Sequence, residues 1–376
     1  MDPRIRDHAE LIVDHSVNVE TGDNVIVTAS PAAENLVVAL SEKLGERGAQ
    51  PALHWNTLYW GNSRPRRAYA RAMDLDDYQS PEHTLAEMEE TDVVILIGGS
   101  RNIAESSDVA PETNAAAGRA YEPVLKERLD KQWVITQHPT TGNAQKAEMS
   151  TETYADFVYR AVNKDWDAQR DHQDQMVEIL DPASEVHIVS GDTTDITMSI
   201  DGMSAENDFG KKNLPGGEVY TVPVPDSVEG EVLFDKPLMW SGREIEDMYL
   251  RFETGEVVEH SAKTNEEVLT SVLDTDDGAR RLGELGIGMN RDIDRFTYNM
   301  LFDEKMGDTI HMAVGDAISE CVPEGMEKNE SAQHVDMIVD MSEDSFIEVD
   351  GEIVQRNGTF VFEDGFEAES TASHQS

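Results

Sequence analysis

The chain has 376 residues, of which 76 are acidic and 30 are lysine or arginine, so its formal net charge at pH 7 is −46. This acidity argues against a nucleic-acid partner, which needs a basic patch. The lack of any run of about 18 apolar residues argues against a membrane span, and the 39% of hydrophobic residues is too high for a disordered chain.

The first half of the chain alternates predicted strands and helices. Its N-terminal segment lacks an apolar signal core and has the pattern of an amphipathic helix. Strands are predicted at residues 23–30, 51–57, 93–100 and 132–139, and helices at residues 31–50, 81–92 and 110–131. Strands separated by helices predict a mostly parallel sheet, and therefore an α/β domain.

A long helix at residues 151–181 is predicted to act as a spacer between two domains. From Glu185 onward, short alternating strands and glycine turns replace the earlier pattern, which predicts an α+β or barrel-like second domain. We therefore expect an α/β domain over residues 1–182 and a second domain over residues 183–376.

The segment NESAQHVDMIVD, residues 329–340, raises the question of a metal site. It is predicted to run from a polar loop into a strand, where side chains two positions apart share a face. His334 and Asp336 then emerge on one face, and Val335 and Met337 on the other. An isolated His-x-Asp is more typical of a solvent-exposed strand face, so the rest of the chain has to decide between the two interpretations.

Three further residues stand in unusual local contexts. Glu218 directly follows Pro-Gly-Gly, Glu284 lies between glycines in an apolar run, and His311 lies in an apolar segment of small residues. An unpaired buried carboxylate is costly, and pairing or metal coordination removes that cost. Carboxylates with imidazoles suit Zn, Co or Mn. Three or more carboxylates with two histidines exceed one tetrahedral zinc site and match the pair of ions used in hydrolysis.

At these residues the chain resembles the thermophilic-type metallo-aminopeptidases, the aminopeptidase T family. The shared motifs are NLPGGEVYTVP, GELGIGMN, LFDEK followed by TIHMAVG, NESAQHVDM and VDGEIVQRNGTF, and they lie between about residues 185 and 361. The resemblance implies two divalent metal ions, with Zn, Co or Mn as candidates, in the second domain. The ligands that it implies are Glu218, Glu284, His311, His334 and Asp336.

The resemblance also implies Glu304 as a sixth ligand. This chain departs from the family pattern in two places. Glu304 lies seven residues before His311, whereas the family's acid lies five residues before its histidine. The family has a catalytic tyrosine seven residues after that histidine, and this chain has Ile318 there. Since isoleucine cannot donate a proton or stabilise an oxyanion, another group supplies this role, or activity is weak, or specificity has moved.

The activity implied by the resemblance is metal-assisted removal of the N-terminal residue from peptides, by a homodimer. Glu218 or Glu284 would act as the catalytic base that takes a proton from water and passes it to the leaving amine. Two alternatives stay open. One is another metallohydrolase, such as an amidase or dipeptidase, and the other is a non-catalytic metal- or peptide-binding protein, which Ile318 would suit.

The acidic residues recur along the whole chain rather than in one tail. Self-repulsion on this scale destabilises a compact chain unless salt screens it, so we expect a salt-adapted host, with an unusually acidic mesophilic protein as the alternative. Cys321 is the single cysteine, which rules out an intrachain disulfide and suits a reducing cytoplasm.

Overall fold

The structure is a computed structural model that describes residues 1–58, 63–240 and 242–367. The chain divides into two compact units. Unit 1 comprises Met1–Asp165 together with Gly210–Gly216, and unit 2 comprises Trp166–Phe209 together with Gly217–Ser376. Within the described ranges, no helix is both long enough and apolar enough to cross a membrane.

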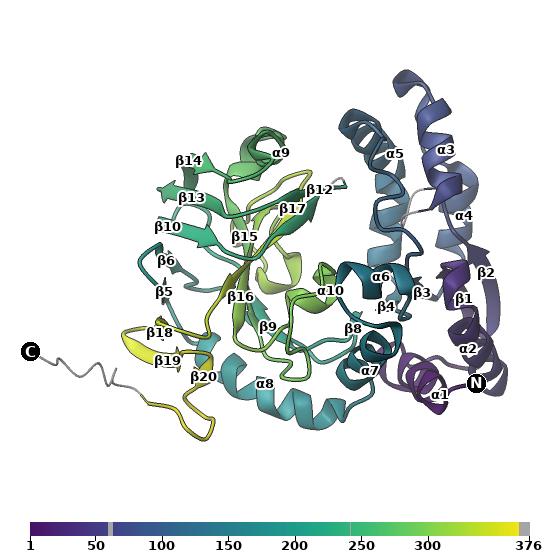
Figure 1. The fold of residues 1–376 in the computed structure, drawn as a ribbon, viewed down its shortest axis with the longest axis horizontal. Coiled ribbons are helices and arrows are strands. Elements are labelled where there is room, and N and C mark those ends of the chain that lie inside the picture. Colours follow the sequence, from purple (N-terminus) through teal and green to yellow (C-terminus); the bar gives the residue numbers. More distant parts are fainter. Residues whose placement is uncertain (59–62, 241, 368–376) are drawn as a thin grey trace, which may run out of the picture. The chain divides into compact units, whose positions relative to one another are not determined.

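Unit 1 is an α/β unit, as the alternation of strands and helices predicts. Its described residues form a five-stranded parallel sheet with the strand order β2-β1-β3-β4-β8. The strands are β1 (Asn24–Ala29), β2 (Gln50–Trp55), β3 (Val93–Gly98), β4 (Gln132–Gln137) and β8 (Asn213–Leu214). The helices, purple to teal in Figure 1, are α1 (Pro3–Glu10), α2 (Glu34–Arg47), α3 (Arg64–Ala72), α4 (Glu82–Glu89), α5 (Pro111–Leu129), α6 (Thr141–Lys146) and α7 (Thr151–Val162).

The helices of unit 1 follow from local sequence signals. In α2, Leu36, Leu40 and Leu44 recur every four residues and are buried, as expected for a helix with one face on the core. The helix ends where Gly48 adopts the left-handed conformation, with φ +76°, which glycine accepts without a steric penalty. Strands β1 and β3 are almost continuously buried, as strands of a covered parallel sheet are.

The stretch predicted as one long helix at residues 151–181 forms two helices, α7 and α8 (Trp166–Leu180). Asn163 leaves the helical conformation, at φ −88° and ψ 72°, and its side-chain amide donates to the Arg4 carbonyl. Helix α7 belongs to unit 1 and α8 to unit 2, and residues 210–216 return to unit 1, whereas the sequence pattern suggested a division after residue 182. The returning segment carries β8, which pairs with β4 and completes the parallel sheet.

Unit 2 is built from antiparallel sheets, which confirms the expected change of architecture. Its described residues form an eight-stranded sheet (β14-β13-β10-β6-β5-β18-β19-β20), a five-stranded sheet (β17-β16-β15-β9-β7) and the two-stranded pair β11-β12 (Figure 1). The strands are β5 (Glu185–Ser190), β6 (Thr194–Ser199), β7 (Glu206–Asp208), β9 (Glu218–Thr221), β10 (Glu229–Phe234), β11 (Leu238–Trp240), β12 (Arg243–Ile245), β13 (Met248–Glu253), β14 (Glu256–Ser261), β15 (Leu282–Gly288), β16 (Thr309–Gly315), β17 (His334–Asp340), β18 (Ser345–Val349), β19 (Glu352–Arg356) and β20 (Thr359–Phe360). Besides α8, the helices are α9 (Glu266–Leu273) and α10 (Met300–Asp303).

One apolar core holds the two large sheets of unit 2 together. It combines Ile188, Ile196 and Leu250 from the eight-stranded sheet with Leu285 and Met312 from the five-stranded sheet, all at most 1% exposed. Since only one face of the five-stranded sheet supplies residues to this core, its other face is available for polar side chains.

Candidate metal centre

The second face of the five-stranded sheet carries the predicted ligands. In β16, His311, Ala313 and Gly315 lie on one face of the sheet, since they alternate along the strand. Glu284 of β15 and Asp336 of β17 both pair with Ala313, and His334 pairs with Gly315, so these ligands share that face. Val335 and Met337, which alternate with His334 and Asp336, point the other way into the core. The His334 and Asp336 side chains are 32% and 18% exposed, so this is a largely enclosed polar face rather than an ordinary solvated one.

In the described part of the chain, two groups of side chains could hold a metal ion, and they share one residue. Glu218, Glu284 and His311 form one triad, and Glu284, His334 and Asp336 form the other, with the ligand atoms of each triad within 4.8 Å of one another. Glu284 joins the triads, since its Oε1 lies 3.3 Å from His311 Nε2 and its Oε2 lies 3.0 Å from His334 Nε2. The structure thus brings five of the six predicted residues together.

Both histidines are oriented by backbone carbonyls. His311 Nδ1 donates to the Glu304 carbonyl at 3.1 Å, and His334 Nδ1 donates to the Asp316 carbonyl at 2.8 Å. Because a carbonyl only accepts, each Nδ1 carries the proton, and each Nε2 is left facing the carboxylates. Histidines that ligate metals are typically held in this way, by a second nitrogen that donates to a carbonyl.

Glycine is required beside His311 for a steric reason. A Cβ atom added to Gly286 would lie 1.9 Å from Cε1 and 2.1 Å from Nε2 of the His311 ring. The imidazole therefore lies against the backbone of β15, where any side chain would exclude it. This explains why the sequence around Glu284 is rich in glycine, since the same strand presents a ligand and makes room for the ligand opposite.

The sixth predicted residue, Glu304, lies at the edge of the centre. It follows α10, and its backbone carbonyl accepts from His311, while its carboxylate contacts the ammonium of Lys305. Lys305 is completely buried, and its Nζ also lies 3.1 Å from Glu218 Oε1. Sequence analysis did not single out Lys305. The available signal was the lysine in DEKM, directly after a candidate ligand, in a chain with only 11 lysines.

Burial and mutual charge shift the pKa values of these groups strongly. Burial raises the pKa of the Glu218 carboxyl to about 8. Burial alone would lower the pKa of His311, but its hydrogen bond to Glu284 and the neighbouring carboxylates outweigh burial and raise that pKa to about 10. Burial would also raise the pKa of Asp336, but the charge of His334 outweighs it and lowers that pKa. The centre is therefore a dense set of acids that attracts positive charge.

The donor set fits a divalent cation. Clustered carboxylates and imidazole nitrogens are ligands of Zn, Co and Mn. Glu218 Oε2 is buried and accepts no hydrogen bond from the described residues, although His311 Nε2 lies 3.6 Å away. A cation between these atoms would satisfy the unpartnered oxygen and offset the repulsion among the acids.

Ile318, which stands where the resemblance would place a tyrosine, is partly buried in a small apolar cluster. It packs with Met203, Val222, Ala317 and Cys321, and the partly buried Tyr220 borders the same cluster. Tyr220 stands two residues after Glu218 in β9, so the two side chains share a face of the sheet.

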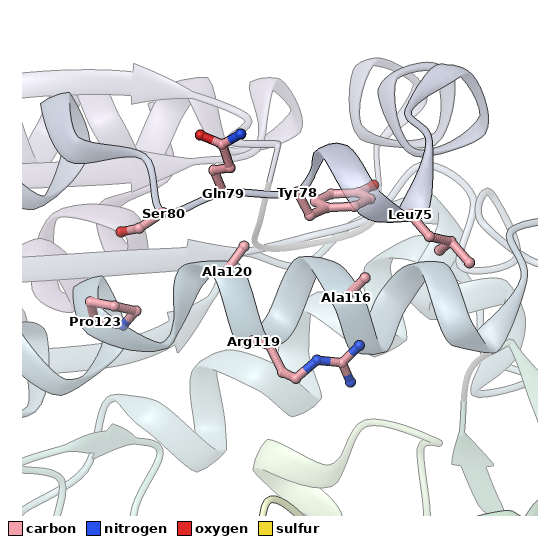
Figure 2. Close-up of a pocket in the computed structure, with 8 residues that line it drawn as sticks. All are labelled: Leu75, Tyr78, Gln79, Ser80, Ala116, Arg119, Ala120 and Pro123. Atoms are coloured by element: carbon pink, nitrogen blue, oxygen red, sulfur yellow. The ribbon is translucent and has the colours of Figure 1, made fainter.

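A hollow of about 260 Å³ in unit 1 does not offer a comparable site. It is lined by Leu75, Tyr78, Gln79 and Ser80, which lie between α3 and α4, and by residues of α5. In Figure 2 the polar ends of Tyr78, Ser80 and Arg119 point in different directions, so they do not converge on a common ligand.

Comparisons with known proteins find similar metalloproteases and aminopeptidases. The family model described as thermophilic metalloprotease (M29) matches residues 1–366. Aminopeptidase 2 from Geobacillus stearothermophilus is 27% identical, over 95% of this chain and 97% of that protein. Aminopeptidase T from Thermus aquaticus is 29% identical, over 91% of this chain and 93% of that protein. The solved structure of wild-type AmpT from Thermus thermophilus has a TM-score of 0.83 at 26% identity and covers 96% of this chain and 99% of its own.

Proposed function

Since this chain belongs to the thermophilic metalloprotease family M29, we propose that the two triads on the five-stranded sheet are its catalytic metal centre. The chain is an aminopeptidase, which removes N-terminal residues from peptides. The observation that carries the assignment of the centre is the position of Glu284, whose two carboxylate oxygens face the Nε2 atoms of two different histidines.

Two divalent ions, with Zn, Co or Mn as candidates, would be held by these residues. Glu218, Glu284 and His311 would hold one ion, and Glu284, His334 and Asp336 the other. Such ions lower the pKa of water and polarise a substrate carbonyl. Glu304 would act as a further ligand only if its carboxylate left Lys305, which it contacts in this structure.

Glu218 is the better candidate for the general base. Both oxygens of Glu284 are engaged by histidines, whereas Glu218 Oε2 accepts no hydrogen bond from the described residues. Burial raises the pKa of Glu218, and an ion held at the same triad would offset that effect and keep the carboxylate deprotonated, as a base must be. Glu218 would accept the proton of the attacking water and deliver it to the leaving amine.

The ligand assignment is tested with His334→Ala and Asp336→Asn. Both should reduce bound metal, measured by mass spectrometry, and abolish hydrolysis of aminoacyl-nitroanilides, because each removes a donor or the charge that offsets a divalent ion. Asp195→Asn is a matched control, since this exposed acid on β6 contacts His187 away from the centre. Full metal content with near-normal kcat/KM in either test variant would remove that residue from the site.

Substrate class is tested by blocking the substrate amine. An aminopeptidase should cleave aminoacyl-nitroanilides and not their N-acetyl forms. Cleavage of both forms would instead favour the amidase alternative. Metal binding without turnover of any peptide would favour a non-catalytic role, which the side chain of Ile318 would explain.

The remaining proposals concern the assembly and its setting. We propose a homodimer, by analogy with the resemblance noted above, and sedimentation in high salt would test it. We also propose that the protein works in a reducing cytoplasm of high salt concentration. The net charge of −46 supports the high salt, and the single, buried cysteine, Cys321, supports the reducing conditions.

A further inference from the structure

Lys305 is a cation built into the proposed metal centre. Its side chain is 0% exposed, and it is the one buried lysine among the described residues. Its ammonium lies 3.1 Å from Glu218 Oε1 and contacts Glu304 Oε1. A buried ammonium is tolerated only where acids compensate it, so Lys305 and these two carboxylates form one unit.

The two triads offer the same donors but differ in their relation to Lys305. Each triad contributes two carboxylates and one imidazole, and Glu284 is common to both. Only the triad with Glu218 has a carboxylate oxygen within ion-pair distance of Lys305 Nζ. A cation that binds in that triad is repelled by the ammonium of Lys305 at ion-pair distance. A cation that binds at His334 and Asp336 has no carboxylate ligand of its own that pairs with Lys305 at that distance.

We propose that Lys305 makes the two ion positions unequal. The first divalent ion fills the triad of Glu284, His334 and Asp336, and the second binds more weakly at the triad that contains Glu218, because Lys305 competes for its acids. Lys305 is thus a positioning residue that sets the order and affinity of metal loading. This inference rests on the proposed two-ion function of the centre.

The charge of Lys305 also explains why Glu304 lies outside both triads. The Glu304 backbone carbonyl orients His311, so the residue is close to the centre, yet its carboxylate is engaged by the ammonium. Removing that ammonium would leave Glu218 Oε1 without its cation, and it would free the Glu304 carboxylate, which is close enough to interact with both Glu218 and Asp336. The loss of the cation at Glu218 Oε1 acts toward tighter binding of the second ion.

The experiment is a Co²⁺ titration of the metal-free full-length protein in high salt, followed by calorimetry and visible absorption. Wild type should take up two ions in separate steps, and Lys305→Met should lower the Kd of the second step by at least about tenfold, because an elementary charge a few ångströms from an ion in a buried site has a large effect. Lys236→Met is the matched control. Lys236 lies in unit 2, is partly buried and pairs with Asp340, but it contacts neither triad.

The outcomes separate this inference from the proposed function. An unchanged or higher second Kd in Lys305→Met would overturn the inference, as would an equal effect of Lys236→Met. If Lys305→Met does not fold, the wild-type titration still decides, because two steps of equal affinity refute the proposal and two unequal steps support it. Lys305→Met protein that binds only one ion while wild type binds two would also overturn the inference. Wild-type protein that binds no Co²⁺, or only one ion, would instead contradict the two-ion centre itself.

Discussion

Replacing Gly286 with alanine should remove metal from the centre without changing any ligand. Gly286 faces His311 across the β15–β16 pair. An alanine Cβ would lie 1.9 Å from the ring, and ordinary contact begins at 3.4 Å, so the imidazole must retreat by 1.5 Å. The backbone itself accepts alanine, because Gly286 does not have a positive φ.

The expected loss follows from this displacement. Misplacing a catalytic group by about 1 Å can cost about 10²-fold in rate, so we expect at least that loss in kcat/KM, together with reduced metal content. Overpacking typically costs about 1–3 kcal/mol of stability, which a domain of this size can survive. The variant should therefore fold and still fail to hold its full complement of metal.

The assay compares metal content, kcat/KM and urea midpoint for Gly286→Ala and Gly45→Ala. Gly45 lies in α2 with nothing within 4 Å of an added Cβ, so this control should gain up to about 1 kcal/mol in stability and keep its activity. If Gly286→Ala retained full metal and normal kcat/KM, the imidazole would not be held where this structure has it.

Three further outcomes are expected. The melting temperature should rise strongly between about 0.1 M and 3 M KCl, because the Debye length falls from about 10 Å to below about 3 Å; an unchanged value would argue against salt adaptation. His8 is buried and burial lowers its pKa to about 3, so the unfolded state takes up the proton first and stability falls as pH drops below about 6.5. Protonation of His8 in the unfolded state should lower the free energy of unfolding by about 2 kcal/mol at pH 5. The variant His8→Gln, which can keep a hydrogen bond to Thr136, should show a weaker pH dependence of urea unfolding. Ile318→Tyr should raise kcat on aminoacyl-nitroanilides, by less than the roughly 10²–10³ that one oxyanion donor supplies elsewhere; no gain in a folded, metal-loaded variant would mean that another residue fills the role.

Local sequence is enough to predict which side chains of β17 share a face. The pattern His-Val-Asp-Met separates a polar face from an apolar one for any strand, and the structure has His334 and Asp336 on the polar face of the sheet. The sequence did not indicate whether that face meets water or an enclosed site. Enclosure depends on Glu218, Glu284 and His311, which come from other strands.

The sequence by itself predicted the α/β first domain and the change to short strands in the second, because hydrophobic periodicity is a property of neighbouring residues. Its short motifs supplied the candidate ligands through the family resemblance. The tertiary structure decided the rest. The buried position of Lys305, the joining of two triads by Glu284, and the need for glycine at Gly286 all arise from contacts between residues distant in the chain. Strand β8 returns to the parallel sheet for the same reason, since pairing with β4 is a non-local contact that no local pattern encodes.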